Sequence, residues 1–150
     1  MSLLVGVDLG ERRIGIAVAE EPGPRARPLA TLHRGESVAA DVDAIRALVP
    51  DESVELVVGL PLEASGAAGT MAAAARSWAA AAAALTGWPV ALRDERLSSH
   101  RAEERLGPMK RGRSGGPPTP AQRRAWRERV DREAAAIILQ DELDARVRGA

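Results

Sequence analysis

Three stretches far apart in this sequence each contain an acidic residue where packing alone would not place one. Asp8 comes directly off an apolar, strand-like run, Glu95 follows a second such run, and Asp131 lies on the apolar stripe of a predicted helix. An acid on an apolar stripe is costly unless it is paired or bound to a cation. If folding brings Asp8, Glu95 and Asp131 together, their oxygens form a site for hard divalent cations, which suits phosphodiester hydrolysis.

Each acid also has a structural explanation that requires no ligand. Asp8 could shape the turn that precedes Gly10. The other two could form ion pairs within their own segments, Glu95 with Arg93 or Arg96 and Asp131 with Arg127 or Arg132. The sequence leaves these alternatives open.

The chemistry expected of three such acids is hydrolysis assisted by two ions, Mg²⁺ or Mn²⁺. One ion would activate water and the other would stabilise the leaving oxygen, so no side-chain nucleophile is needed. The absence of cysteine agrees with this chemistry, and it excludes disulfides and thiolate metal sites. The two histidines, His33 and His100, are expected to be incidental.

The bulk composition is that of a single globular domain. The chain has 150 residues, 45% hydrophobic and 28% charged, with no Phe, no Tyr and three Trp. A platform of stacked aromatics for single-stranded nucleic acid is therefore not expected. No apolar run reaches the length of a membrane span and no leader precedes the first strand, so we expect a cytoplasmic protein without a membrane partner.

The net charge of zero hides an asymmetry along the chain. Residues 96–132 contain eleven Lys and Arg against four Asp and Glu, whereas the remainder is acidic by the same margin. A basic block on an acidic domain predicts contact with a polyanion, and the alternative is a solvated charged loop.

Basic residues at three places are candidates for contacts with nucleic acid. Arg13 follows the first strand, where it could touch a phosphate or pair with Glu11 or Glu20. The others lie in a loop rich in Gly and Pro, and at the start of the last helix. Such contacts position a substrate without reading its sequence. The full candidate set is Arg13, Lys110, Arg111, Arg113, Arg123, Arg124 and Arg127.

Hydrophobic periodicity predicts alternating strands and helices. Short apolar runs predict strands at residues 3–9, 14–19, 29–33, 54–59 and 88–93. Helical spacing predicts helices at residues 38–49, 71–85, 98–106 and 121–147, with Ser98 or Ser99 as the cap of the third. Residues 107–120 contain four Gly, four Pro and three basic residues, which predicts a flexible basic loop.

This order predicts an α/β fold with a mixed five-stranded sheet flanked by helices. Three leading strands favour an antiparallel meander, and the two later strands, separated by helices, favour parallel crossovers. Glu95 then follows the carboxyl end of a parallel strand, where open α/β sheets place their sites. Asp131, Ala135, Ile138 and Leu139 share one face of the last helix, which should cover the sheet.

Four motifs in this order resemble those of the YqgF family, whose members are also called RuvX or Holliday junction resolvases. The motifs are GVDLGERRIGIA at residues 6–17, VVGLPL at 57–62, DERLSS at 94–99 and VDREAAAIIL at 130–139. The resemblance covers the chain nearly end to end. It departs from the family in Ser98-Ser99, where Thr-Thr is more usual, and in the loop after Pro61, which lacks an Asn/Asp-rich turn.

The resemblance implies an RNase H-like fold and a metal-dependent nuclease with catalytic acids Asp8, Glu95 and Asp131. It further implies maturation of the 5′ end of the 16S ribosomal RNA precursor, and so a role in ribosome biogenesis. The rival substrate is a four-way DNA junction, which would require a homodimer to cut two strands symmetrically. Related nucleases often use a fourth acid, for which Asp94 is the candidate.

Two other classes of function compete with the nuclease. The Asp-x-Gly hairpin also opens actin-like ATPases and sugar kinases, but those proteins need two such lobes and this chain has one copy. A ribosome- or transcription-associated binding protein without catalysis is the remaining alternative. An Asp8→Asn variant separates that alternative from the nuclease.

Overall fold

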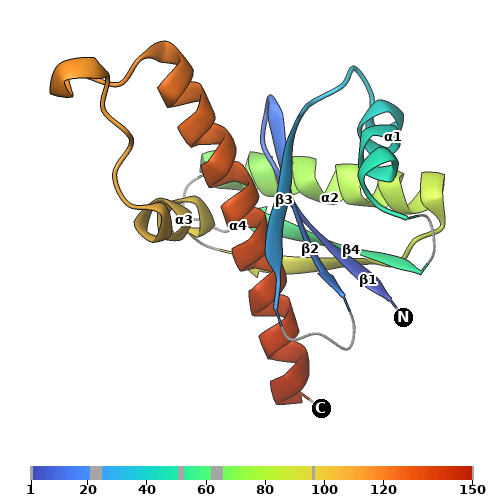
Figure 1. Cartoon of the computed structure of the whole chain (residues 1–150). Coiled ribbons are helices and arrows are strands. Elements are labelled where there is room, and N and C mark those ends of the chain that lie inside the picture. Colours follow the sequence, from blue (N-terminus) through green and yellow to red (C-terminus); the bar gives the residue numbers. More distant parts are fainter. Residues whose placement is uncertain (1, 21–24, 51–52, 62–65, 96, 150) are drawn as a thin grey trace.

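A computed structural model describes residues 2–20, 25–50, 53–61, 66–95 and 97–149. Its five strands form one sheet in the order β3-β2-β1-β4-β5 (Figure 1). The first three strands are antiparallel, and β4 and β5 run parallel to β1. The predicted mixed sheet is confirmed. The strands are β1 Leu3–Leu9, β2 Arg13–Glu20, β3 Arg27–His33, β4 Val54–Pro61 and β5 Val90–Glu95.

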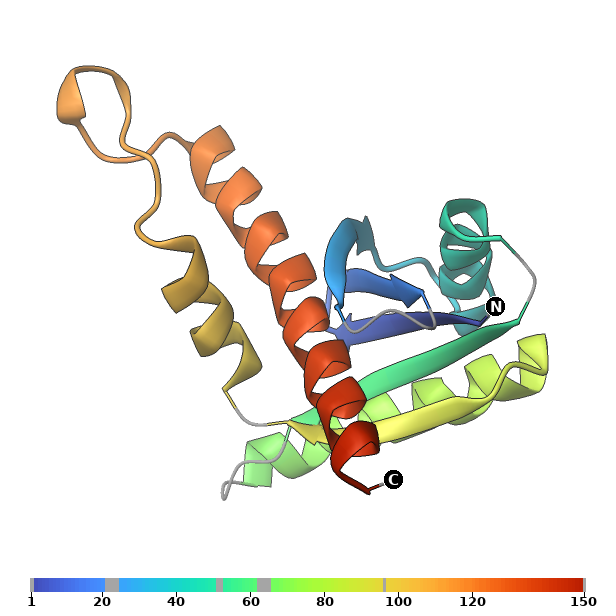
Figure 2. The ribbon, with the colours of Figure 1, turned by 60° about the horizontal axis from the view of Figure 1, so that its bottom comes forward.

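Helices cover both faces of the sheet. They are α1 Val38–Leu48, α2 Gly66–Thr86, α3 Ser98–Leu106 and α4 Pro120–Gly149. Helices α1 and α2 pack on one face, where Val5 and Val7 of β1 meet Ile45 and Trp78. Helix α4 crosses the other face, where Leu4 meets a stripe of apolar residues that includes Ile138 and Leu139. Figure 2 shows α3 lying against α4, away from the sheet.

Glycines on three neighbouring strands allow α4 to approach the sheet closely. A Cβ atom on Gly6 would lie 2.7 Å from the Ala135 carbonyl oxygen, and one on Gly59 would lie 2.5 Å from Ile138. A Cβ atom on Gly15 would lie 1.9 Å from the backbone oxygen of Asp131. Because these glycines have no side chain, they determine where α4 can cross the three strands.

The first turns of α4 extend beyond the sheet (Figure 2). The segment that connects α3 to α4 forms a loop near the start of α4. This segment contains a short 3₁₀ turn, η1 Arg113–Gly115, and backbone hydrogen bonds such as that from Gly112 N to Gly116 O, 3.1 Å. It is tied to the helix by Gln122, whose side chain donates to the Arg111 carbonyl oxygen, 2.9 Å. Pro120, placed in the loop by the sequence, is the first residue of α4.

Several local predictions differ from the structure, and helix α2 begins at Gly66 rather than at residue 71. Strand β5 begins at Val90 and continues through Glu95, because it pairs with β4 as far as Pro61. The prediction of Ser98 or Ser99 as a helix cap is wrong. The cap of α3 is Leu97, with a φ of 58° and no side-chain hydrogen bond. No helix in the described part of the chain combines the length and apolarity needed to cross a bilayer.

Candidate active site

Asp8 and Asp131 are brought together by the crossing of α4 over β2. Asp8 lies opposite Gly15 in the β1–β2 ladder, and the backbone of Asp131 rests on Gly15. Burial, followed by the negative charge of Asp131, raises the pKa of Asp8 from 3.8 to about 7. Two of the three predicted acids therefore form a partly buried pair with excess negative charge.

The guanidinium group of Arg13 is the positive charge that contacts this acidic pair. Its Nε donates to Asp131 Oδ2 at 2.5 Å across a sequence separation of 118 residues. The hydrogen bond to Asp131 raises the pKa of Arg13 above its ordinary value. In the described residues Arg13 pairs with Asp131, rather than with Glu11 or Glu20, and Asp131 pairs with neither Arg127 nor Arg132.

Two acidic side chains are buried among the described residues, and they differ in kind. Asp41 accepts hydrogen bonds from Gly35 N at 2.7 Å, Arg34 Nε at 3.0 Å and Trp78 Nε1 at 3.1 Å, so it is a structural residue that anchors α1. Glu95 is 7% exposed and faces other ionisable groups. Of these two buried acids, Glu95 is therefore the candidate for a catalytic role.

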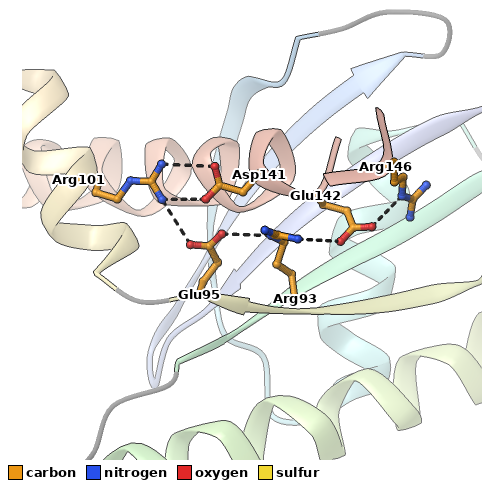
Figure 3. A network of polar contacts seen from close by, with 6 residues as sticks. All are labelled: Arg93, Glu95, Arg101, Asp141, Glu142 and Arg146. Atoms are coloured by element: carbon orange, nitrogen blue, oxygen red, sulfur yellow. Dashed lines mark hydrogen bonds and ion pairs between the residues drawn. The ribbon is translucent and has the colours of Figure 1, made fainter. Parts of the chain in front are cut away.

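Glu95 forms a second acidic pair, with Asp141 of α4 (Figure 3). Arg101 of α3 lies between them: its Nη1 is 2.8 Å from Asp141 Oδ2 and 3.5 Å from Glu95 Oε2. Arg93 Nε lies 3.4 Å from Glu95 Oε1, which makes the ion pair expected from the sequence, while the alternative partner Arg96 lies outside the described residues. Asp141 was not among the predicted site residues.

The two acids of this second pair titrate together. Burial, a hydrogen bond with Asp141 and the charge of Asp141 raise the pKa of Glu95 to about 8, against the opposing effect of Arg101 and Arg93. Burial also acts to raise the pKa of Asp141, but hydrogen bonds from Arg101 and Glu95 outweigh it and lower that pKa. Burial and the neighbouring charge of Asp141 therefore favour uptake of a proton by the pair, and Arg101 and Arg93 oppose it.

The second pair is part of a longer ionic network that fastens α4 to the sheet. Arg93 Nη1 lies 3.6 Å from Glu142 Oε1, and Arg146 Nε donates to Glu142 Oε2 at 2.8 Å (Figure 3). Arg146 also pairs with Glu55 of β4. The buried Nε of Arg93 makes no hydrogen bond, only the ion pair with Glu95. The network holds α4 in register over β4 and β5.

The two acidic pairs lie on the same face of the sheet but apart. Asp8 shares a strand face with Gly6, and Glu95 shares one with Ala91. Gly6 and Ala91 pack against α4, so both acidic side chains also face α4. One strand, β4, separates β1 from β5, which places the two backbones about 10 Å apart. Within the residues that the structure describes, no three Asp, Glu or His side chains gather closely enough to hold one metal ion.

Asp94, the candidate fourth acid, lies on the opposite face of β5 from Glu95. It is exposed and belongs to the strand, so alternation turns it away from α4. The acid that lies beside Glu95 is Asp141, which the sequence analysis did not consider. A possible signal was its position on α4, ten residues after Asp131 and beside the apolar stripe.

The chemistry of the donor set fits a divalent cation. Both acidic pairs consist of carboxylates, the ligands that Mg²⁺ and Mn²⁺ prefer. Each pair contains an acid whose pKa is raised toward or above neutrality, and each is contacted by a guanidinium group, from Arg13 or Arg101. Positive charge is therefore stabilising at both positions.

The structure brings four of the seven predicted nucleic-acid contacts to one place. Arg13, Arg123, Arg124 and Arg127 line a common pocket at the start of α4. Lys110 lines a separate pocket on the other flank of the helix, with Trp126. Of the remaining two, Arg111 contacts the Gly115 carbonyl oxygen at 3.4 Å, and the side chain of Arg113 lies outside what the structure describes.

The sheet order and the helix on each face define an RNase H-like fold. A solved structure with this arrangement is T. thermophilus RuvC in complex with a Holliday junction substrate. It superimposes with a TM-score of 0.54 at 17% sequence identity, covering 97% of this chain and 96% of that chain. At this identity the likeness concerns the fold.

The chain belongs to the RuvX family, whose description is Holliday junction resolvase and whose pattern matches residues 2–145. A relative from Anaeromyxobacter dehalogenans (strain 2CP-C) is 47% identical over 144 residues, which cover 95% of this chain and 96% of the relative. A relative from Chloroflexus aggregans is 40% identical over 146 residues, covering 95% and 94%. Both bear the name "Putative pre-16S rRNA nuclease". The family resemblance read from the four sequence motifs is confirmed, and with it membership of a nuclease family.

Proposed function

We propose that this protein is a metal-dependent endonuclease that trims the 5′ end of the 16S rRNA precursor in the cytoplasm. The observation that carries the proposal is the Asp8–Asp131 pair, held by the crossing of α4 over Gly15. The pKa of Asp8, raised to about 7 by burial and by Asp131, describes a site that favours an added cation. The names of the relatives support the choice of substrate.

Asp8, Glu95 and Asp131 are the proposed catalytic acids and would hold Mg²⁺ or Mn²⁺, with two ions in the full site. When bound, these ions supply an activated water and stabilise the leaving oxygen. Asp8 and Asp131 lie together in the structure, whereas Glu95 lies across β4 beside Asp141. Asp141 is therefore a candidate to support or join Glu95.

The protein's own residues provide orientation and charge. Arg13 holds Asp131 in place in the absence of a cation. The close packing of α4 on the sheet keeps water from one side of the Asp8–Asp131 pair, which strengthens electrostatic interactions there. The proposed contacts with nucleic acid are made by the basic residues of the hairpin, loop and helix start: Arg13, Lys110, Arg111, Arg113, Arg123, Arg124 and Arg127.

A four-way DNA junction is the second candidate substrate, because the family is described as a Holliday junction resolvase. Symmetric cutting of a junction requires two active sites related by a two-fold axis, and so a homodimer. An rRNA precursor requires a single cut and places no such demand. The oligomeric state in solution therefore separates the two substrates.

The decisive experiment is a cleavage assay with purified protein on precursor 16S rRNA and on a four-way junction, side by side in Mn²⁺. We expect cleavage of the rRNA, and its loss by at least a hundredfold in Asp8→Asn, Glu95→Gln and Asp131→Asn. These changes preserve shape, so circular dichroism should show an unchanged fold. Asp94→Asn, on the far face of β5, is the matched control and should retain activity.

Two results would contradict the proposal. Retained cleavage in one of the three variants removes that acid from the catalytic set. Cleavage or growth indifferent to Asp8→Asn favours a binding protein without catalysis.

A further inference from the structure

A pocket of about 350 Å³ lies between the β1–β2 turn, the end of β3 and the first turns of α4. Its volume is within the range of about 300–1,000 Å³ typical of small-ligand sites. The lining contains no acidic residue. It is dominated by Arg12, Arg13, His33, Arg123, Arg124 and Arg127.

Apart from Arg13, which pairs with Asp131, the arginines of this pocket have no acidic partner among the described residues. Arg123 donates to the carbonyl oxygen of Pro118 at 2.6 Å, and Arg127 donates to that of Arg123 at 3.4 Å. Across the described residues, no carboxylate forms an ion pair with these two or with Arg12 and Arg124. Like charges so close together repel, and an anion in the pocket would relieve that repulsion.

The donors available to an anion are side chains rather than the helix end. Thr119 and Gln122 cap α4 reciprocally: Thr119 N donates to Gln122 Oε1 at 2.8 Å, and Gln122 N donates to Thr119 Oγ1 at 3.1 Å. Pro120 has no backbone N–H. The arginine fork geometry, which matches phosphate oxygens, therefore defines the chemistry of the pocket.

Arg13 connects this pocket to the candidate catalytic acids. The same side chain lines the pocket and contacts Asp131 at 2.5 Å. An anion bound in the pocket therefore lies one side chain away from the Asp8–Asp131 pair. A strand whose scissile phosphodiester lies at these acids would therefore pass close to the pocket.

The lining also indicates which part of a nucleotide is bound. It contains no Trp: Trp78 and Trp88 are buried in the core, and Trp126 lines the separate pocket with Lys110. A tryptophan platform for a base is therefore absent from this lining, and its five arginines favour contact with the charged backbone.

We propose that the arginine pocket binds one backbone phosphate of the strand that is cut, adjacent to the scissile phosphodiester. This inference rests on the proposed nuclease function and adds to it a fixed position for the substrate. Arg12 and His33, which were not among the sequence candidates, belong to this phosphate site. Arg13 sets its distance from the acids.

The test is a scan of the substrate phosphates. The wild-type protein first maps the cut in an RNA that spans the 5′ end of 16S rRNA. Fluorescence anisotropy then measures binding of the Asp8→Asn protein to copies of that RNA, each with one uncharged methylphosphonate linkage. We expect one linkage beside the cut to weaken binding about tenfold, because it loses a charge-assisted contact.

Arg124→Ala, made in the Asp8→Asn protein, identifies the partner of that phosphate. The sensitive linkage should then cause no further loss of affinity, because the contact is already absent. Arg76→Ala is the matched control, since Arg76 is an exposed arginine of α2 on the other side of the sheet. It should leave the whole pattern unchanged.

The outcomes distinguish this inference from the proposed function. If the wild-type protein cuts the RNA but every linkage has the same effect, or the sensitive one keeps its effect in Arg124→Ala, the phosphate site is overturned and the nuclease stands. If the RNA binds through one coupled phosphate but is never cut, the proposed function fails and adjacency to a scissile bond fails with it.

Discussion

The backbone carbonyl oxygen of Asp131 rests on Gly15, 1.9 Å from the point where a Cβ atom on that glycine would stand. Asp8 lies directly opposite Gly15 on the neighbouring strand. One close contact between a helix and a strand therefore pairs two acids that are more than a hundred residues apart. The glycine in the second half of the first motif serves the site by having no side chain.

Replacing Gly15 by alanine should destabilise the protein by about 3 kcal/mol or more, since the clash is with backbone that cannot rotate away. Helix α4 would have to lift from β2, which separates Asp131 from Asp8. Urea unfolding measures the loss. Gly69→Ala is the control, because nothing lies within 4 Å of its Cβ position and it is in a helix, so it should stabilise by up to about 1 kcal/mol. Equal effects of the two changes would refute the close contact.

The stability of the metal-free protein should fall as pH rises from about 4 to about 7. The pKa of Asp8 is raised from 3.8 to about 7 in the folded state, so the folded protein binds this proton more tightly than the unfolded chain. Stability from that proton is present below pH 4 and is lost as pH passes 7. The Asp8→Asn protein should not show this loss, and at pH 8 it should be more stable than the wild-type protein by about 2 kcal/mol. This value is smaller than the full pKa shift would give, because Asp8 is partly exposed and solvent screens its charge. Thermal unfolding with a chelator across this pH range checks it, and parallel curves for the two proteins would contradict it.

Mn²⁺ should raise the Tm of the wild-type protein and not that of Asp8→Asn or Asp131→Asn. A ligand at a hundred times its Kd stabilises the folded state by about 2.7 kcal/mol. Arg13→Gln should tighten Mn²⁺ binding, because its guanidinium competes for Asp131. Differential scanning calorimetry and titration calorimetry measure both effects. An unchanged Mn²⁺ response in the two acid variants would place the cation elsewhere.

Asp141→Asn should lower the pKa of Glu95 from about 8. The change removes a negative charge and a hydrogen bond that favour protonated Glu95, and leaves Arg101 and Arg93 to favour the carboxylate. Carbon-detected NMR of glutamate carboxyl groups measures the titration. Asp94→Asn is the comparison, because Asp94 is adjacent in sequence but on the other face of β5. If both changes shift Glu95 equally, Asp141 is not its specific partner.

Most of the fold was predictable because local patterns determine it. Short apolar runs identified all five strands, and the helix 98–106 was placed at its observed bounds. Asp8 and Asp131 were found because an acid on an apolar run is conspicuous. The pairing of Arg13 with Asp131 was not predicted, since both have charged neighbours nearer in sequence and only the packing of α4 brings them together.

The second acidic pair could not be found from local sequence. Asp141 resembles any charged residue on a helix surface. The packing of α4 over the sheet places it near Glu95, where Arg101 of α3 contacts both acids. His33 lines the arginine pocket because β3 ends there, a consequence of sheet pairing rather than of its neighbours.

A single unbroken helix, α4, carries Arg124, Asp131 and Asp141. With a rise of 1.5 Å per residue, Asp131 lies about 10 Å along the axis from Arg124 and about 15 Å from Asp141. The helix therefore fixes the spacing between the arginine pocket and the two acidic pairs. Inserting one residue between Arg124 and Asp141 would rotate the part of α4 beyond the insertion by about 100° and would separate the arginine pocket from the acids that α4 carries.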